Sequence, residues 1–126
     1  MIVIVPLGGI GDRFKKLGFK EPKALIEVEQ KPILFHLLDN LNLKNIDFVY
    51  IPYNKEYEKH DFENIVKNKY SGIKFKFLKL ESNTRGAAET LNIAIQNLTY
   101  PDCPVLCVDS DNFYLTDIVN LWNGEN

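Results

Sequence analysis

The sequence predicts a three-layer α/β/α domain, in which helices cover both faces of a mainly parallel sheet. Three observations predict this fold class. Apolar runs of strand length alternate along the chain with segments of helical periodicity. The first run, residues 2–5, is apolar at every position, as in strands that are buried on both faces. A length of 126 residues fits one domain of ordinary size, spanning residues 1–126.

The N-terminal third contains the first strand and the first helix. A glycine-rich segment, residues 7–14, follows the strand at residues 2–5. The apolar patch at residues 24–28 predicts a short strand extension or a hairpin. Pro32 suits the first turn of a helix, because its φ is already helical and its missing N–H would have no partner there. Apolar residues then recur at helical spacing: Ile33, Leu34, Leu37, Leu38 and Leu41.

The middle of the chain adds two strands and a helix. Residues 47–52 predict a second buried strand. A polar helix is predicted over residues 56–69, with four inward-facing residues: Tyr57, Phe62, Ile65 and Val66. Residues 74–77 alternate between lysine and phenylalanine, which is typical of a strand nearer the edge of a sheet.

The C-terminal third completes the alternation. A helix is predicted over residues 86–98, with an inward face formed by Ala87, Leu91, Ala94, Ile95 and Leu98. Residues 105–108 predict a fourth core strand, and a short helix is expected from about Thr116. Because strands alternate with helices, we expect the strands to be parallel and the helices to lie on both faces.

Composition excludes several classes of protein. The formal net charge is -2 and no basic block occurs, so nucleic acid is not expected as a partner. The apolar run before Pro6 is too short for a signal peptide or a membrane span. Cys103 and Cys107 fall in one apolar stretch and are expected to be buried, reduced thiols of a cytoplasmic protein.

The glycine-rich segment is the first candidate site. Gly8, Gly9 and Gly11 let the backbone turn sharply and approach a ligand, so that successive N–H groups can surround phosphate oxygens. Arg13 adds a planar fork suited to phosphate, and Lys23, after a proline, offers a second positive charge. A tight turn with surface cations is the simpler alternative. The segment lacks the third glycine of the dinucleotide-binding pattern, which disfavours a plain dinucleotide binder.

Two further segments fall at expected strand ends. Gly86 permits close approach at the start of a helix, and Asn83 and Thr84 precede it; simple helix capping by either is the alternative. Asp109 and Asp111 follow the fourth strand, where two carboxylates can hold a hard cation such as Mg²⁺. An ordinary Asp-rich turn is the alternative there. All three segments are placed where a parallel sheet binds its ligand, beyond the carboxyl ends of its strands.

Together these segments resemble the sugar-phosphate nucleotidyltransferase family, which includes thymidylyl-, uridylyl- and cytidylyltransferases. Residues 6–14 resemble its glycine-rich signature, residues 21–23 its Pro-Lys element, and residues 86–88 its Gly-Thr-Ala nucleobase segment. Residues 109–112 resemble its metal aspartate after the fourth strand. The resemblance covers nearly the whole chain and implies the Rossmann-like nucleotide-diphospho-sugar transferase fold.

The resemblance also implies a reaction. An NMP group would pass from an NTP to a sugar phosphate or a similar phosphorylated small molecule, with release of pyrophosphate. Backbone groups from Leu7 to Gly11 would hold the base and phosphates. Arg13 would stabilise the β- and γ-phosphates, and Lys23 would sit at the α-phosphate and the incoming phosphate. Catalysis would then rest on positioning and charge neutralisation.

The remaining roles fall at the later strand ends. By the same resemblance, Gly86 would contact the base, with Asn83 or Thr84 as a side-chain reader. Asp111, with Asp109, would hold Mg²⁺. The family implies a cytoplasmic enzyme that makes activated sugars for capsule, lipopolysaccharide or another surface glycan.

The chain departs from the family in length. Members run substantially longer, and their later half supplies the acceptor pocket and a second metal carboxylate. The resemblance therefore implies a nucleotide-binding part whose acceptor-binding half is missing. Two alternatives stay open: a glycosyltransferase of the related fold that uses a nucleotide sugar, and a non-catalytic NTP-binding module. A short sheet would also leave an exposed edge, which a homo-oligomer would bury.

Overall fold

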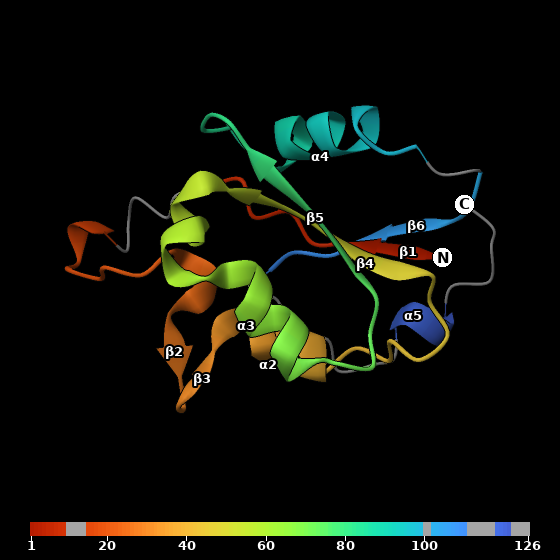
Figure 1. The fold of residues 1–126 in the computed structure, drawn as a ribbon, viewed down its shortest axis with the longest axis horizontal. Helices are drawn as coiled ribbons and strands as arrows, with labels where there is room; N and C mark the ends of the chain where they lie inside the picture. The colour runs from red at the N-terminus through yellow and green to blue at the C-terminus, as the bar shows by residue number, and fades with distance from the viewer. Residues whose placement is uncertain (10–14, 100–101, 111–117, 122–126) are drawn as a thin grey trace.

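A four-stranded parallel sheet forms the centre of the molecule (Figure 1). The computed structural model describes residues 1–9, 15–99, 102–110 and 118–121. The strand order is β5-β4-β1-β6. The bounds of the strands are β1 Ile2–Ile4, β4 Phe48–Asn54, β5 Phe75–Leu80 and β6 Val105–Cys107. The predicted parallel sheet is confirmed, with the central strands β1 and β4 fully buried.

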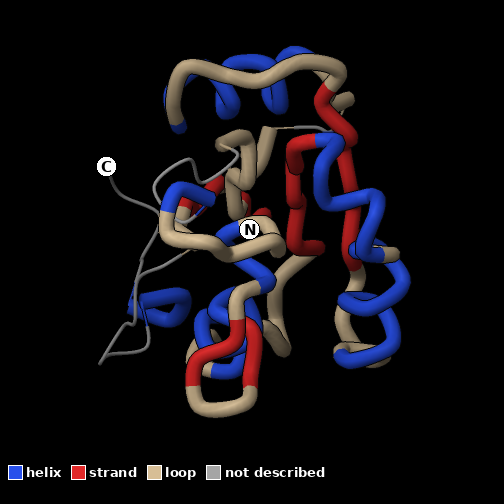
Figure 2. The backbone as a smooth tube through the Cα atoms, turned by 90° about the vertical axis from the view of Figure 1, so that its left-hand side faces the viewer, coloured by secondary structure: helices blue, strands red, loops and turns tan. Residues whose placement is uncertain are grey.

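Helices cover both faces of this sheet, as predicted. Helices α2 (Ile33–Asp39) and α3 (Phe62–Lys69) lie on one face, and α4 (Ala87–Gln96) lies on the other (Figures 1 and 2). Alternate residues of β1 face the helices on opposite sides of the sheet. Val3 packs in the core with α2 and α3, whereas Ile2 packs in the core with α4. None of the helices among the described residues is long and apolar enough to span a membrane.

The segment between β1 and β4 contains a hairpin. A single 3-10 turn, η1 (Lys23–Leu25), leads into strands β2 (Glu27–Val28) and β3 (Lys31–Pro32), which pair antiparallel. The residues that join them, Glu29 and Gln30, both have positive φ. Pro32, predicted in the first turn of this helix, is instead the N-cap of α2, one position before its first residue, Ile33. Of the two options for residues 24–28, the structure therefore contains the hairpin.

The polar helix predicted over residues 56–69 is in fact two helices. A 3-10 helix, η2 (Lys55–His60), ends at Asp61, whose left-handed backbone (φ 55°) separates it from α3. Three of the four residues predicted to face inward are buried: Tyr57 in η2, and Phe62 and Val66 in α3. The prediction for Ile65 is wrong, because its side chain is 38% exposed.

Strand β6 and helix α4 differ from their predictions in how far their residues are buried. Strand β6 pairs with β1 and is an outer strand of the described sheet, so Val105 is 47% exposed and Cys107 is exposed rather than buried. Both cysteines are free, as predicted, but Cys103 is half-buried. The inward face of α4 is centred on Thr90 and Ala94. Its other predicted members are less covered, and Ile95 is 57% exposed. A short helix, α5 (Ile118–Leu121), follows β6.

Candidate functional site

The carboxyl ends of β1, β4 and β5 converge on one edge of the sheet, because the three strands are parallel neighbours. Leu7 continues β1 beyond its last residue and bridges to Tyr53 of β4. Its N–H donates to the Pro52 carbonyl at 2.8 Å, and its carbonyl accepts from the Asn54 N–H at 2.8 Å. Leu7 therefore anchors the start of the glycine segment, and its own N–H is engaged within the sheet.

Gly8 lies in a space that no larger residue fits. A Cβ at this position would lie 2.0 Å from Thr90 Oγ1 and 2.4 Å from Thr84 Oγ1. Real Cβ atoms do not approach other atoms so closely. The backbone of the glycine segment thus passes directly against the start of α4. By contrast, a Cβ on Gly9 would have no heavy atom of the described residues within 4 Å.

The side chain of Asn54, at the end of β4, joins the neighbouring strand ends. It is fully buried, at 0% exposure. Its Nδ2 donates to the Gly8 carbonyl at 3.1 Å and to Asn83 Oδ1 at 2.7 Å. Its Oδ1 accepts from the Glu56 N–H at 3.0 Å and so begins η2. All the hydrogen-bonding groups of this amide are directed at loops that follow β1, β4 and β5.

Thr84 and Thr90 form a hydroxyl pair above Gly8. Their Oγ1 atoms lie 2.7 Å apart, and Thr90 Oγ1 also donates to the Gly86 carbonyl at 3.1 Å. Gly86, with extended backbone, is the N-cap of α4, and no side chain caps this helix. The capping alternative for Asn83 and Thr84 is therefore wrong, because their side chains bond to Asn54 and Thr90 instead.

Lys23 lies half-buried in η1, beside this edge of the sheet. The two residues after it, Ala24 and Leu25, belong to the same apolar core as Val5 and Leu7. The turn that carries the lysine is thus part of the core on the side of the sheet that α2 and α3 cover. The other predicted cation, Arg13, lies outside the described residues, as does Gly11.

The predicted metal ligands are described in part. Asp109 is exposed and follows β6, at the same edge of the sheet as Gly8. Although Cys107 is exposed as a residue, partial desolvation of its thiol, and then the charge of Asp109, raise the pKa of that thiol. Asp111 lies outside the described residues. Within the part of the chain that the structure describes, no three acidic, histidine or cysteine side chains gather in a group that could hold a metal ion.

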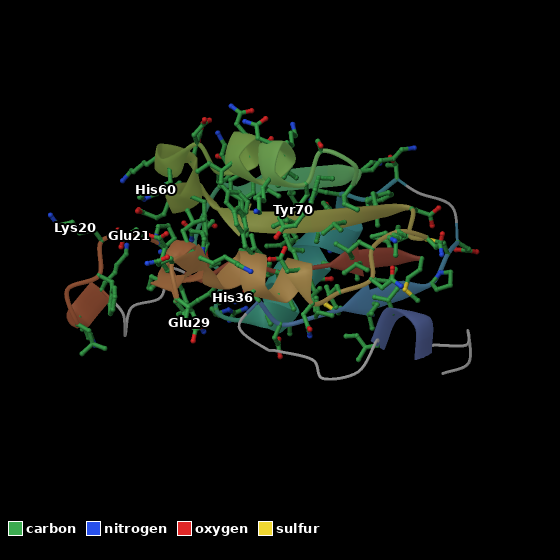
Figure 3. All side chains as sticks on the ribbon, turned by 90° about the horizontal axis from the view of Figure 1, so that it is seen from below. Lys20, Glu21, Glu29, His36, His60 and Tyr70 are labelled. Atoms are coloured by element: carbon green, nitrogen blue, oxygen red, sulfur yellow. The ribbon has the colours of Figure 1, made fainter. Side chains whose placement is uncertain are left out.

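A hollow in the surface lies away from these strand ends. Its volume is about 540 Å³, and it is lined by Phe19, Leu25, Ile26, Pro32 and Ile65, with Glu21, Glu27 and His60 among them. Figure 3 shows Glu21 and His60 on the same side of the molecule, and His36 on the separate helix α2. None of the predicted site residues that the structure describes lines this hollow, so it is distinct from the convergence at Gly8.

Sequence reasoning missed Asn54 and Thr90. Both are buried polar residues, the two that the described core contains. A polar residue that ends a wholly apolar strand was the available signal for Asn54. For Thr90 the available signal was its position four residues after Gly86, because residues four apart are neighbours on the surface of a helix.

A parallel α/β sheet with a glycine segment and a helix N-terminus at its carboxyl edge defines a class of nucleotide- or phosphate-binding proteins. The family described as nucleotidyl transferase matches residues 2–123. The chain belongs to this family, as its resemblance predicted.

Individual relatives agree with this assignment. The chain is 25% identical, over 118 residues, to a D-glycero-alpha-D-manno-heptose 1-phosphate guanylyltransferase of Aneurinibacillus thermoaerophilus. Its fold is that of the nucleoside-diphosphate-sugar pyrophosphorylase of Vibrio cholerae RC9 (TM-score 0.75, 20% identity, 96% of this chain). It is also similar to the CTP:phosphocholine cytidylyltransferase of Streptococcus pneumoniae (TM-score 0.56, 24% identity, 93% of this chain). The chain spans about half the length of these proteins, at 49%, 52% and 48%.

Proposed function

We propose that this chain forms the NTP-binding part of a nucleotidyltransferase that transfers NMP from an NTP to a sugar phosphate and releases pyrophosphate. The observation that carries the proposal is the contact of Gly8 with Thr84 and Thr90, which leaves no room for a Cβ. This contact holds the glycine segment against α4 and the loop before it, at the carboxyl edge of the sheet, where such folds bind nucleotides. The sugar-phosphate acceptor is supported by the name of the guanylyltransferase relative.

In this proposal different residues at the sheet edge contact different parts of the nucleotide. Backbone N–H groups of Gly8, Gly9 and Gly11 face the phosphates, and Gly86, with Asn83 or Thr84, faces the base. An oxygen of the acceptor phosphate attacks the α-phosphorus in line, and pyrophosphate leaves from the opposite side. No covalent bond to the protein forms, so catalysis consists of positioning and of neutralising charge.

Two cations and a metal supply that neutralisation. Arg13 stabilises the leaving β- and γ-phosphates, and Lys23 acts at the α-phosphate. Asp109 and Asp111 would hold Mg²⁺; the exposed carboxylate of Asp109 at the sheet edge offers the oxygen ligand that this hard cation prefers. When bound, Mg²⁺ would offset the negative charge of the phosphates.

We place this reaction in the cytoplasm, in the synthesis of activated sugars for a surface glycan such as capsule or lipopolysaccharide. Two free thiols in the chain support a reducing compartment. Because the chain spans about half of its relatives' length, nucleotide binding is the step that its own residues are proposed to perform.

Calorimetric titration with CTP, UTP, dTTP, ATP and GTP, each with and without Mg²⁺, tests the proposal. We expect Mg²⁺-dependent binding of one NTP by the unsubstituted chain. Gly8→Ala should abolish it, since the added methyl group would push Thr84 and Thr90 away. Gly72→Ala is the matched control, because a Cβ there meets no atom of the described part of the chain within 4 Å. No binding of any NTP, or equal binding by the Gly8 variant, would show that the proposal is wrong.

A further inference from the structure

The buried hydroxyl of Tyr57 forms a hydrogen bond with the backbone beside Lys23. The Ala24 N–H donates to the hydroxyl oxygen of Tyr57 at 3.2 Å. The two residues are 33 positions apart in the sequence. Ala24 is fully buried and Tyr57 is 1% exposed, so water does not compete for this hydrogen bond. The contact joins η2, which follows β4, to η1, which carries the lysine.

The position of the Tyr57 hydroxyl is fixed from the β4 side. Asn54 is the N-cap of η2, and its side chain accepts a hydrogen bond from the N–H of Glu56. Glu56 is the residue directly before Tyr57. The Tyr57 ring packs edge-on against Phe62 and Tyr53, with ring centroids 5.0 Å and 6.4 Å away. The hydroxyl therefore belongs to a rigid part of the molecule and not to a mobile surface side chain.

The turn that carries Lys23 depends on such an outside contact. It is a single 3-10 turn of three residues, closed by bonds from the Leu25 N–H to the Pro22 carbonyl (2.9 Å) and from the Ile26 N–H to the Lys23 carbonyl (3.2 Å). No side chain caps it. A turn this short holds its own geometry weakly. The bond to Tyr57 fixes the peptide unit immediately after Lys23.

We propose that Tyr57 is a positioning residue for Lys23: by holding the Ala24 N–H, it sets the direction in which the lysine side chain leaves η1 toward the phosphates. This inference rests on the proposed function, in which Lys23 acts at the α-phosphate. The same buried amide, Asn54, bonds to Gly8 and begins η2, so the glycine segment and the lysine turn share one support.

The hydroxyl keeps this role over a wide pH range. Burial raises the pKa of Tyr57 to about 12, although the bond from Ala24 acts in the opposite direction. Tyr57 is therefore neutral under ordinary conditions and does not place a negative charge next to the lysine turn.

A double-mutant cycle in Mg²⁺–NTP affinity tests the inference. Tyr57→Phe keeps the ring and removes the hydroxyl. In the presence of Lys23 we expect it to weaken binding about tenfold, and in a Lys23→Ala background by less than about twofold. Tyr50→Phe is the matched control, because it also removes one buried hydroxyl bonded to a backbone atom, the Ala94 carbonyl at 3.0 Å. It should change binding by less than about twofold in either background.

The outcomes separate the two hypotheses. Equal weakening by Tyr57→Phe in both backgrounds, or none in the presence of Lys23, would overturn the inference and leave the proposed function intact. Absence of NTP binding by the unsubstituted chain would overturn both. If Tyr57→Phe does not fold, amide hydrogen exchange of the unsubstituted chain decides. The Ala24 amide should be protected as strongly as those of β1, and fast exchange would overturn the inference.

Discussion

Asn54 donates a hydrogen bond from Nδ2 to Asn83 Oδ1 over 2.7 Å, and so joins the carboxyl ends of two neighbouring parallel strands. The same nitrogen also bonds to the Gly8 carbonyl. A single buried amide therefore holds together two segments of the candidate site that lie far apart in the sequence. Its replacement should affect stability and nucleotide binding together.

We expect Asn54→Asp to lower the free energy of unfolding by about 2–3 kcal/mol. A carboxylate can still accept the Glu56 N–H, but it cannot donate to Gly8 or Asn83 and would place a buried charge against both oxygens. Urea unfolding measures the change. Asn64→Asp is the control, since Asn64 is exposed and bonds to Asp61 on the surface. A loss no larger than that of the control would contradict this account of Asn54.

Removal of the Thr90 hydroxyl should loosen the start of α4. Thr90→Val keeps the shape of the side chain but loses its contacts with Thr84 Oγ1 and the Gly86 carbonyl. We expect a loss of about 1–2 kcal/mol in unfolding free energy, with weaker NTP binding. Thr90→Ser retains the hydroxyl and should keep most of the affinity. If valine and serine behave alike, the hydroxyl pair has no part in the site.

Gly9 allows binding to be separated from folding. A Cβ there meets no atom of the residues that the structure describes, so Gly9→Ala should leave the melting temperature unchanged or slightly raised. In the proposed site the same methyl group would lie against the phosphates, and NTP affinity should fall. Differential scanning fluorimetry and calorimetry measure the two effects. Unchanged affinity would show that the nucleotide does not approach Gly9.

Asp39 should make stability depend on acid pH. Burial raises the pKa of this carboxyl, but hydrogen bonds from Lys31 and Tyr70 and the charges of Lys31 and Lys69 outweigh it and lower the pKa below 3.8. A lowered pKa in the folded state stabilises the protein above the unfolded-state value, and this contribution is lost as pH falls through the folded-state pKa. Urea unfolding between about pH 5 and pH 2 should show a steeper loss for the unsubstituted chain than for Asp39→Asn. Equal slopes would rule out this role.

The parts of the fold that the sequence predicts are those set by local pattern. The apolar run that follows Asp47 in the segment 47–52 and the helical spacing in α2 each indicate burial directly, and both elements are present. The break at Asp61 was not predictable in this way, because a left-handed residue inside a helical pattern depends on how η2 is fixed to β4. The exposure of Val105 likewise depends on strand order, which no local pattern records.

The candidate site shows the same division. Glycines at positions 8 and 86 were identified from the sequence because glycine has few other reasons to recur at strand ends. Asn54 and Thr90 are identified as site residues only by their hydrogen-bond partners. Asn54 bonds to Gly8, which lies 46 residues away in the sequence, and the Thr90 hydroxyl bonds to the Thr84 hydroxyl. A buried polar side chain is recognised by what it bonds to, and those contacts form only in the folded chain.

The hairpin between η1 and α2 offers a route to a more robust protein for laboratory use. Glu29 and Gln30 both adopt positive φ, 52° and 66°, in a two-residue connection that favours asparagine followed by glycine. Neither residue is suited to that backbone, and each pays about 1–2 kcal/mol in strain. Replacing the pair with Asn-Gly would release strain at a surface that the candidate site does not use. Such a background would tolerate the destabilising substitutions above and keep their effects on nucleotide binding measurable.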